Sequence, residues 1–259
     1  MLNTIRPYIT KDEPFGPIDS GDIDSSDLKA LLMLFEKHNL IYKNLHSRPS
    51  IIIGRRGSGK TYYLRSVFFD KQYDYYVEIR TPRVLGQVAK AIQKLSTEVV
   101  FSEMVSELWD TILWISVLLE IRKHPVLHQD TLNVVDAYLA KMRVRSMDTV
   151  EDALRNVANM LEEIVSKSSV TESEMLWGAD KISLNDAKAA VLKDLETADK
   201  KFAVLMDSLD DFQLDIDSVS HSLQGLLKLV GSMNKPRDIV DIRFCLPAEV
   251  YHRFIKISS

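Results

Sequence analysis

The sequence predicts an α/β fold built around a parallel sheet, and three observations carry that prediction. A β-branched run, residues 51–54 (IIIG), leads directly into the glycine-containing loop GRRGSGKT of residues 54–61. Runs of strand length then alternate with helical patterns, as in βαβ units. A later apolar run, residues 202–206 (FAVLM), ends in a cluster of acidic residues. Strands of a parallel sheet are apolar on both faces, so we expect residues 51–54 to be buried on both.

The composition is that of a globular, cytoplasmic chain. Of 259 residues, 46% are hydrophobic and 27% are charged, which can bury the core of one large domain or of one domain with an insertion. The formal net charge of −4 provides no global attraction to nucleic acid or to an anionic membrane, although a local basic patch stays open. The single cysteine, Cys245, and an N-terminus without a signal-peptide pattern favour a reducing compartment.

The expected elements follow in chain order. Residues 1–25 are an acidic leader whose Pro, Gly, Asp and Ser content is typical of disorder. A domain spans residues 26–259 and opens with an amphipathic helix that runs to about Asn39. Helices are also expected after Pro82, after the acidic cluster up to about Gly231, and from Ala248 onward. The expected strands are 51–54, 74–79, 202–207 and 241–246.

A helical insertion is expected between about residues 101 and 199. One apolar face steps by three and four from Val150 to Ile164, and another follows Ser183 up to Leu195. The stretch TILWISVLL, residues 111–119, is too short to cross a membrane and predicts a buried helix. We interpret the three tryptophans as core residues rather than ligand-stacking groups: Trp109, Trp114 and Trp177.

The loop at residues 54–61 contains the residues expected to bind an anionic ligand. Gly54, Gly59, Lys60 and Thr61 fit the pattern G-x-x-x-x-G-K-[ST], in which glycines let backbone N–H groups turn toward an anion. The lysine reaches the outer phosphates, the threonine hydroxyl ligates Mg²⁺, and the following helix presents its positive end. A flexible Gly-Ser surface turn would not need a buried strand before it. The candidate nucleotide-binding residues are Gly54, Arg55, Arg56, Gly57, Ser58, Gly59, Lys60, Thr61 and Tyr62.

A second acid is expected at the end of a neighbouring strand. Asp207 directly follows the run 202–206 and is the candidate to hold a Mg²⁺-bound water. Asp211 is the first candidate for the general base and Asp210 the second, with Lys60 as the catalytic lysine. The alternative is that these acids only cap the next helix.

These two motifs resemble those of a known division of ATPases. Residues 54–61 look like a Walker A motif, and FAVLMDSLDD resembles the Walker B motif of STAND ATPases and their KAP and AAA+ relatives. The resemblance covers about half of the chain. It implies a three-layer P-loop NTPase core with ATP, Mg²⁺ and strand order 5-1-4-3-2, in which the four expected strands are strands 1 to 4 in chain order.

The chain departs from this pattern in three places. Leu246 and Pro247 stand at the tip of strand 4, where a polar or arginine sensor is common, with Arg243 inside the strand and Glu249 beyond. Asp211 replaces the more frequent glutamate, which shortens the reach of the base. The sequence ends at Ser259 before a fifth strand or a helical lid, so either it is a fragment or something else covers that edge.

The other polar residues distinguish less clearly between possible functions. NKPRD, residues 234–238, has one residue more than the guanine-reading N-K-x-D, so ATP is favoured over GTP. The spacing of the histidines fits no zinc site, since Pro125 separates His124 from His128. Either an arginine of a neighbouring subunit or one of this chain could supply transition-state charge. The candidates in this chain are Arg55, Arg56 and Arg65 near the expected phosphate site, and Arg80 and Arg83 near the end of the second strand.

Two functions of different classes result. The first is a Mg²⁺-dependent ATPase that couples its nucleotide state to shape or assembly, with the helical insertion as the surface for a protein partner or another copy. The second is a module that binds ATP without turnover and is completed by another domain or subunit. A small-molecule kinase fits less well, because the insertion is long and apolar rather than a compact arginine-rich lid. The net charge neither requires nor excludes nucleic acid as an effector.

Overall fold

The computed structural model describes residues 50–55, 57–65, 73–79, 101–167, 170–207, 216–233 and 239–252. The expected leader, the helix ending near Asn39 and the helix after Pro82 lie outside these residues. The strands are β1 (Ile51–Gly54), β2 (Tyr75–Ile79), β3 (Phe202–Met206) and β4 (Val240–Pro247). The helices are α4 (Lys60–Arg65), α6 (Phe101–Ile121), α7 (Gln129–Lys141), α8 (Val150–Lys167), α9 (Val170–Thr197) and α10 (Ile216–Met233). Residues 248–252 are also helical.

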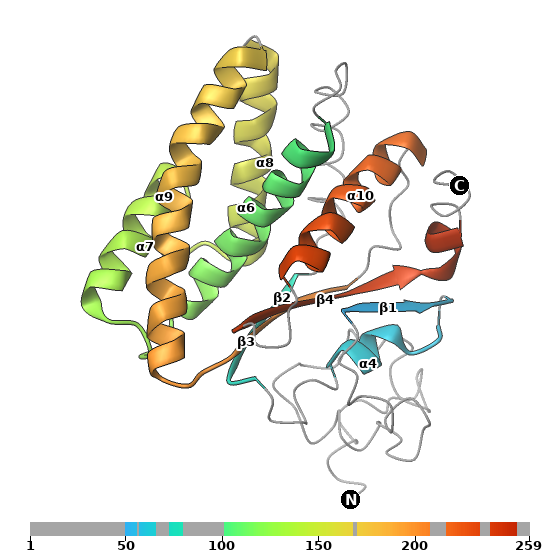
Figure 1. Ribbon diagram of the computed structural model, residues 1–259, viewed down its shortest axis with the longest axis horizontal. Coiled ribbons are helices and arrows are strands. Elements are labelled where there is room, and N and C mark those ends of the chain that lie inside the picture. The colour runs from blue at the N-terminus through green and yellow to red at the C-terminus, as the bar shows by residue number, and fades with distance from the viewer. Residues whose placement is uncertain are drawn as a thin grey trace, which may run out of the picture.

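The four strands form one parallel sheet in the order β1-β4-β3-β2 (Figure 1). Phe244 of β4 lies level with Ile51 of β1 on one side and with Met206 of β3 on the other. On the far side of β3, Ile79 of β2 is level with Met206. The α/β fold, the four expected strands and the order 1-4-3-2 among them are therefore confirmed.

Alternating side chains divide the sheet into two faces. Val204 and Ile242 point into a large core together with α6 and α10, whereas Leu205 and Cys245 pack against Leu64 of α4. Helices consequently cover both faces, with α4 on one side and α6 and α10 on the other (Figure 1). This arrangement buries the apolar strands β3 and β4, as expected for a parallel sheet.

Strand β1 differs from expectation. Ile53 is 43% exposed, and no residue described for β1 is fully buried. Among the described strands β1 pairs with β4 alone, so it stands at an edge of the sheet. Ile51 and Ile52 pack on the two core clusters, whereas Ile53 near the carboxyl end of β1 is left exposed. The prediction that this run is fully buried was therefore wrong.

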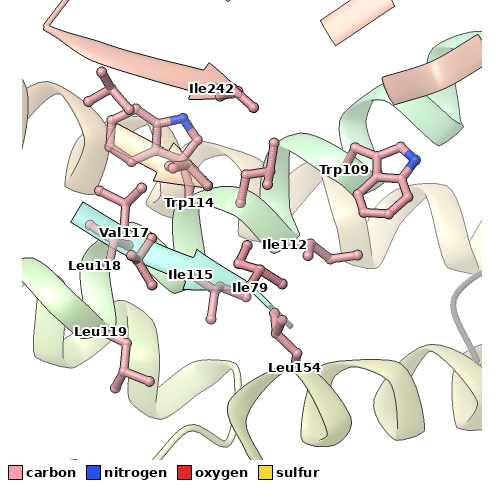
Figure 2. Close-up of a cluster of buried hydrophobic side chains, with 14 of the residues drawn as sticks. Ile79, Trp109, Ile112, Trp114, Ile115, Val117, Leu118, Leu119, Leu154 and Ile242 are labelled. Atoms are coloured by element: carbon pink, nitrogen blue, oxygen red, sulfur yellow. The ribbon is translucent and has the colours of Figure 1, made fainter. Parts of the chain in front are cut away.

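Helix α6 joins the sheet to the helical region. Every residue from Thr111 to Leu119 is buried, which confirms the buried helix expected there. A helix that is apolar all round must be enclosed by other elements, and α6 contacts β2 and α10 as well as α7, α8 and α9. Trp109 and Trp114 are core residues, as predicted, whereas the side chain of Trp177 lies outside the described part. Figure 2 shows both rings with Ile79 and Leu154 around α6.

The helical region between β2 and β3 has the two predicted apolar faces. Helix α8 begins at Val150, and Leu154 and Val157 are buried. Helix α9 begins at Val170 rather than behind Ser183. The apolar face expected after Ser183 lies within this longer helix and is buried, as Leu184 and Leu195 show, and the Ser183 Oγ accepts a hydrogen bond of 2.7 Å from Lys141 of α7. No helix in the described ranges has the length and apolarity needed to span a membrane.

Candidate functional site

The loop between β1 and α4 is tightly curled. Gly57 and Gly59 have φ angles of 75° and 80°, in the left-handed region that favours glycine. The Ser58 N–H donates to the Arg55 carbonyl oxygen over 3.2 Å, and the Tyr63 N–H donates to the Gly59 carbonyl oxygen over 3.0 Å. The pattern of glycines therefore has a conformational cause: two positions in this loop adopt backbone angles that other residues rarely adopt.

Gly54 closes the loop from the strand side. A Cβ atom built there would lie 2.4 Å from Ser58 Oγ and 3.2 Å from Lys60 Cγ, which is closer than packed atoms approach. The Lys60 Nζ donates a 3.0 Å hydrogen bond to the Arg55 carbonyl oxygen, and Lys60 is buried. The lysine side chain thus runs along the inside of the curled backbone.

Asp207 lies at the same edge of the sheet as the loop. Gly54 ends β1 and Met206 ends β3, and because the strands are parallel both carboxyl ends meet at one edge, with β4 between them. Asp207 is buried, and its N–H donates to the Ile79 carbonyl oxygen over 3.2 Å, which extends the β2–β3 ladder by one residue. Ligand sites of open α/β sheets lie at this edge.

The expected general bases lie outside the described residues. Asp207 is the last described residue of the acidic cluster, and Asp210 and Asp211 fall in the undescribed segment 208–215. The same holds for Arg56, Arg80, Arg83 and the turn at 234–238, and for the side chain of Tyr62. Thr61 is half-buried in the first turn of α4. The structure therefore places the loop and Asp207 at the same edge of the sheet, with Lys60 and Thr61 in the first turn of α4.

A buried ion pair lies on the face of the sheet that α4 covers. Arg65 at the end of α4 is 1% exposed, and Glu78 of β2 is 10% exposed. The Arg65 Nε donates to Glu78 Oε1 over 3.1 Å and the Nη2 donates to Oε2 over 3.2 Å. Burial raises the pKa of Glu78, the charge and hydrogen bonds of Arg65 oppose that rise, and the negative charge of Asp207 adds to it.

A second polar cluster lies toward the amino ends of the strands. The Tyr73 hydroxyl donates to the Asp241 carboxylate and accepts a 3.1 Å hydrogen bond from Arg243 Nη2. The Arg243 guanidinium also stands 5.4 Å from the centre of the Tyr73 ring. Burial, followed by the bond to Asp241, raises the pKa of Tyr73 to about 12. Arg243 is thus inside β4 and bonded to Tyr73, while Leu246 and Pro247 form the end of the strand.

Side chains that commonly bind metal ions do not cluster in the described part of the chain. Across the residues that the structure describes, no group of three or more His, Cys, Asp and Glu side chains could hold a metal ion by itself. His124 and His128 lie between α6 and α7, where the His124 ring stacks on Tyr75 with centroids 4.5 Å apart.

Comparisons with known proteins found no match: no protein-family model, no curated protein and no solved structure is similar to this chain. The functional argument therefore depends on the residues and their geometry alone.

Sequence reasoning missed Glu78, and it treated Arg65 only as one arginine near the loop. The signal was present in each case. An acid inside the strand YYVEI, and alternate charges in VDIRFCLP, need buried partners, because an unpaired charge in a sheet core is costly. What the sequence did not give was the partner, since Glu78 and Arg65 are joined only by the folding of α4 across the sheet.

Proposed function

We propose that the chain is a Mg²⁺-dependent ATP-binding and hydrolysing switch protein with a P-loop NTPase core. The observation that carries the proposal is the curled loop 54–59 at the carboxyl end of β1, with Lys60 inside it and Asp207 at the same sheet edge. A Cβ at Gly54 would fill this cradle, so the backbone is arranged for close contact. The strand order is the one that the resemblance implies for strands 1 to 4.

The residues present fit a nucleoside triphosphate with a divalent cation. The backbone N–H groups of residues 54–62 would hold the phosphates, and the Lys60 ammonium would offset their outer charge. The Thr61 hydroxyl is a Mg²⁺ ligand in this scheme, and Asp207 accepts from a metal-bound water. When bound, the cation supplies neutralisation of the charge that develops on the transferred phosphoryl group. The protein's own part is to position these groups and to exclude bulk water.

Hydrolysis requires a base beyond Asp207. Asp211, with Asp210 as the second choice, is proposed to orient and deprotonate the attacking water. Both follow Asp207 by a few residues and precede α10. A change in this segment would act directly on α10, which packs on α6 and through it on the helical region. We accordingly propose that the helical region changes its arrangement with the nucleotide state and that it binds a protein partner or another copy.

The alternative is an ATP-binding module without turnover, completed by another domain or subunit. The exposure of Ile53 favours it, because an apolar side chain on β1, the edge strand among those described, gives a second domain a surface to cover.

A phosphate-release assay separates the two functions. With Mg²⁺ and ATP the purified chain is expected to release phosphate well above background, and Lys60→Ala and Asp211→Asn should each abolish the release. Tight ATP binding without phosphate release, unaffected by Asp211→Asn, would favour the module. Absence of both binding and release would contradict the proposal. Repeating the assay with added DNA or RNA tests for a nucleic-acid effector.

A further inference from the structure

The buried Arg65–Glu78 pair has no task in the function proposed above. Both oxygens of the Glu78 carboxylate accept from the Arg65 guanidinium, over 3.1 and 3.2 Å. The pair joins the last residue of α4 to the middle of β2, and α4 is the helix whose first residues are Lys60 and Thr61. A two-point contact of this kind fixes orientation as well as distance.

Glu78 also faces Asp207. Glu78 lies level with Leu205 in the parallel register, so both side chains are on the α4 face of the sheet. Asp207 is two residues beyond Leu205 and keeps that face, because side chains alternate along a strand. The two carboxylates belong to neighbouring strands and are both largely buried, with 10% exposure for Glu78 and 6% for Asp207.

Two negatively charged carboxylates on neighbouring strands repel each other more strongly in a buried site than in water. A nearby buried positive charge offsets such a repulsion. Arg65 is 1% exposed and supplies a fixed positive charge on the side of Glu78, where it contacts both oxygens. Two further buried cations lie in the described part of this region: Lys60, which extends along the loop, and Arg243, which is level with Leu205 and donates to Tyr73.

We propose that Arg65 is a positioning residue for Asp207 that acts through Glu78. Its bidentate bond ties β2 to α4, and its charge offsets the repulsion between the Glu78 and Asp207 carboxylates, so that Asp207 keeps its place at the carboxyl edge of the sheet. The role of Asp207 toward a bound cation rests on the proposed function. The charge balance among the three side chains does not.

A purely structural brace would behave differently. If Arg65 only ties α4 to β2, its replacement should cost the same stability whether or not Asp207 is charged. If Arg65 offsets the repulsion between the two carboxylates, the cost should shrink when Asp207 is neutralised. The discriminating quantity is therefore the coupling between Arg65 and Asp207, two residues on different elements.

The first measurement uses the ligand-free protein. Denaturant unfolding is compared for wild type, Arg65→Gln, Asp207→Asn and the double variant. We expect Arg65→Gln to reduce the folding equilibrium constant at least about threefold more in the wild-type background than in the Asp207→Asn background. Equal losses in both backgrounds would overturn the proposal. If Arg65→Gln alone does not fold, recovery of folding in the double variant supports the proposal, and failure of the double variant contradicts it.

The second measurement is Mg²⁺-ATP binding, with Arg65→Gln/Glu78→Gln as the matched control. Arg65→Gln should weaken binding about tenfold or more, a loss of the size that an uncompensated buried charge produces. The double variant has no unpaired carboxylate at position 78 and should return to within about threefold of wild type. A double variant as weak as Arg65→Gln would contradict the charge balance. If wild type itself binds no Mg²⁺-ATP, the proposed function fails, and the ligand-free cycle still decides the present inference.

Discussion

Gly225 of α10 and Val105 of α6 are in direct backbone-to-side-chain contact. A Cβ atom built on Gly225 would lie 2.3 Å from Val105 Cγ1 and 2.8 Å from Val105 Cβ, and 3.0 Å from the Ser106 nitrogen. The missing side chain therefore lets two helices approach closely. Helix α10 follows the acidic segment after Asp207, and α6 begins the helical region, so this contact joins the candidate site to that region.

Replacing Gly225 with alanine should destabilise the protein. The new methyl group must displace the Val105 side chain and the adjacent backbone, and overpacking of this kind costs about 1–3 kcal/mol. The control is Gly231→Ala in the same helix, where no atom lies within 4 Å of the added Cβ. There alanine should be neutral or stabilise by up to about 1 kcal/mol, because it is the better helix former. Thermal or urea unfolding measures both, and equal effects would contradict the close approach.

Gly54→Ala should damage the loop. The methyl group would stand 2.4 Å from Ser58 Oγ and 3.2 Å from Lys60 Cγ, so the Ser58 side chain must move within the loop. We expect ATP affinity to fall by about tenfold or more, as for other distorted polar sites. Ser58→Ala combined with Gly54→Ala should restore part of the affinity lost in Gly54→Ala, because it removes the atom in closest conflict. Wild-type affinity in Gly54→Ala would show that the loop does not hold the ligand through its backbone.

Tyr73 should make the fold sensitive to alkali. Its pKa rises from 10.0 to about 12 in the folded protein, first because of burial and then because of the bond to Asp241. The unfolded chain therefore loses the phenol proton first, and the free energy of unfolding should fall as the pH rises from about 10 to about 12. Below the unfolded pKa this contribution is fully present.

The matched variant for this effect is Tyr73→Phe. Lysines titrate in the same window, so the decisive quantity is the difference between wild type and Tyr73→Phe in urea unfolding at each pH. The wild type should lose stability more steeply than the variant across the window. The difference in tyrosinate absorbance between wild type and variant should develop at a higher pH than for an exposed tyrosine. Parallel pH profiles would show that the hydroxyl is not held in the polar cluster with Asp241 and Arg243.

Leu118→Ala should be among the most destabilising substitutions in the helical region. Leu118 is 0% exposed in α6, and removal of its side chain leaves a cavity that costs about 2–5 kcal/mol. Met147, 93% exposed between α7 and α8, is the control, and Met147→Ala should change stability by no more than about 0.5 kcal/mol. Denaturant unfolding compares the two. A small loss for Leu118→Ala would mean that α6 is not enclosed.

The parts of the fold that the sequence predicted are those governed by local pattern. The strands, the buried helix at 111–119 and the apolar face beginning at Val150 depend on runs and periods that neighbouring residues carry. The placement of Asp207 followed from its position after an apolar strand. The sequence-based expectation failed at Ile53, because the exposure of a strand residue depends on which distant elements pack over it.

The remaining features are long-range and were not predictable from spacing. The Arg65–Glu78 pair joins residues 13 positions apart across α4 and β2, and the Tyr73–Arg243 bond spans 170 positions. Ser183 lies inside α9, where its Oγ accepts a hydrogen bond from Lys141, 42 positions earlier in the chain. In each case the partner that decides the role of a polar side chain comes from a distant part of the chain.

The most direct test of the account is calorimetric titration of the protein with Mg²⁺-ATP, because the central claim is that loop 54–59, Lys60 and Asp207 form one nucleotide site. The account predicts saturable binding heat that Lys60→Ala abolishes, and that Asp207→Asn weakens with Mg²⁺ more than without it. Heat no larger than that of dilution, or equal binding by all three proteins, would contradict it.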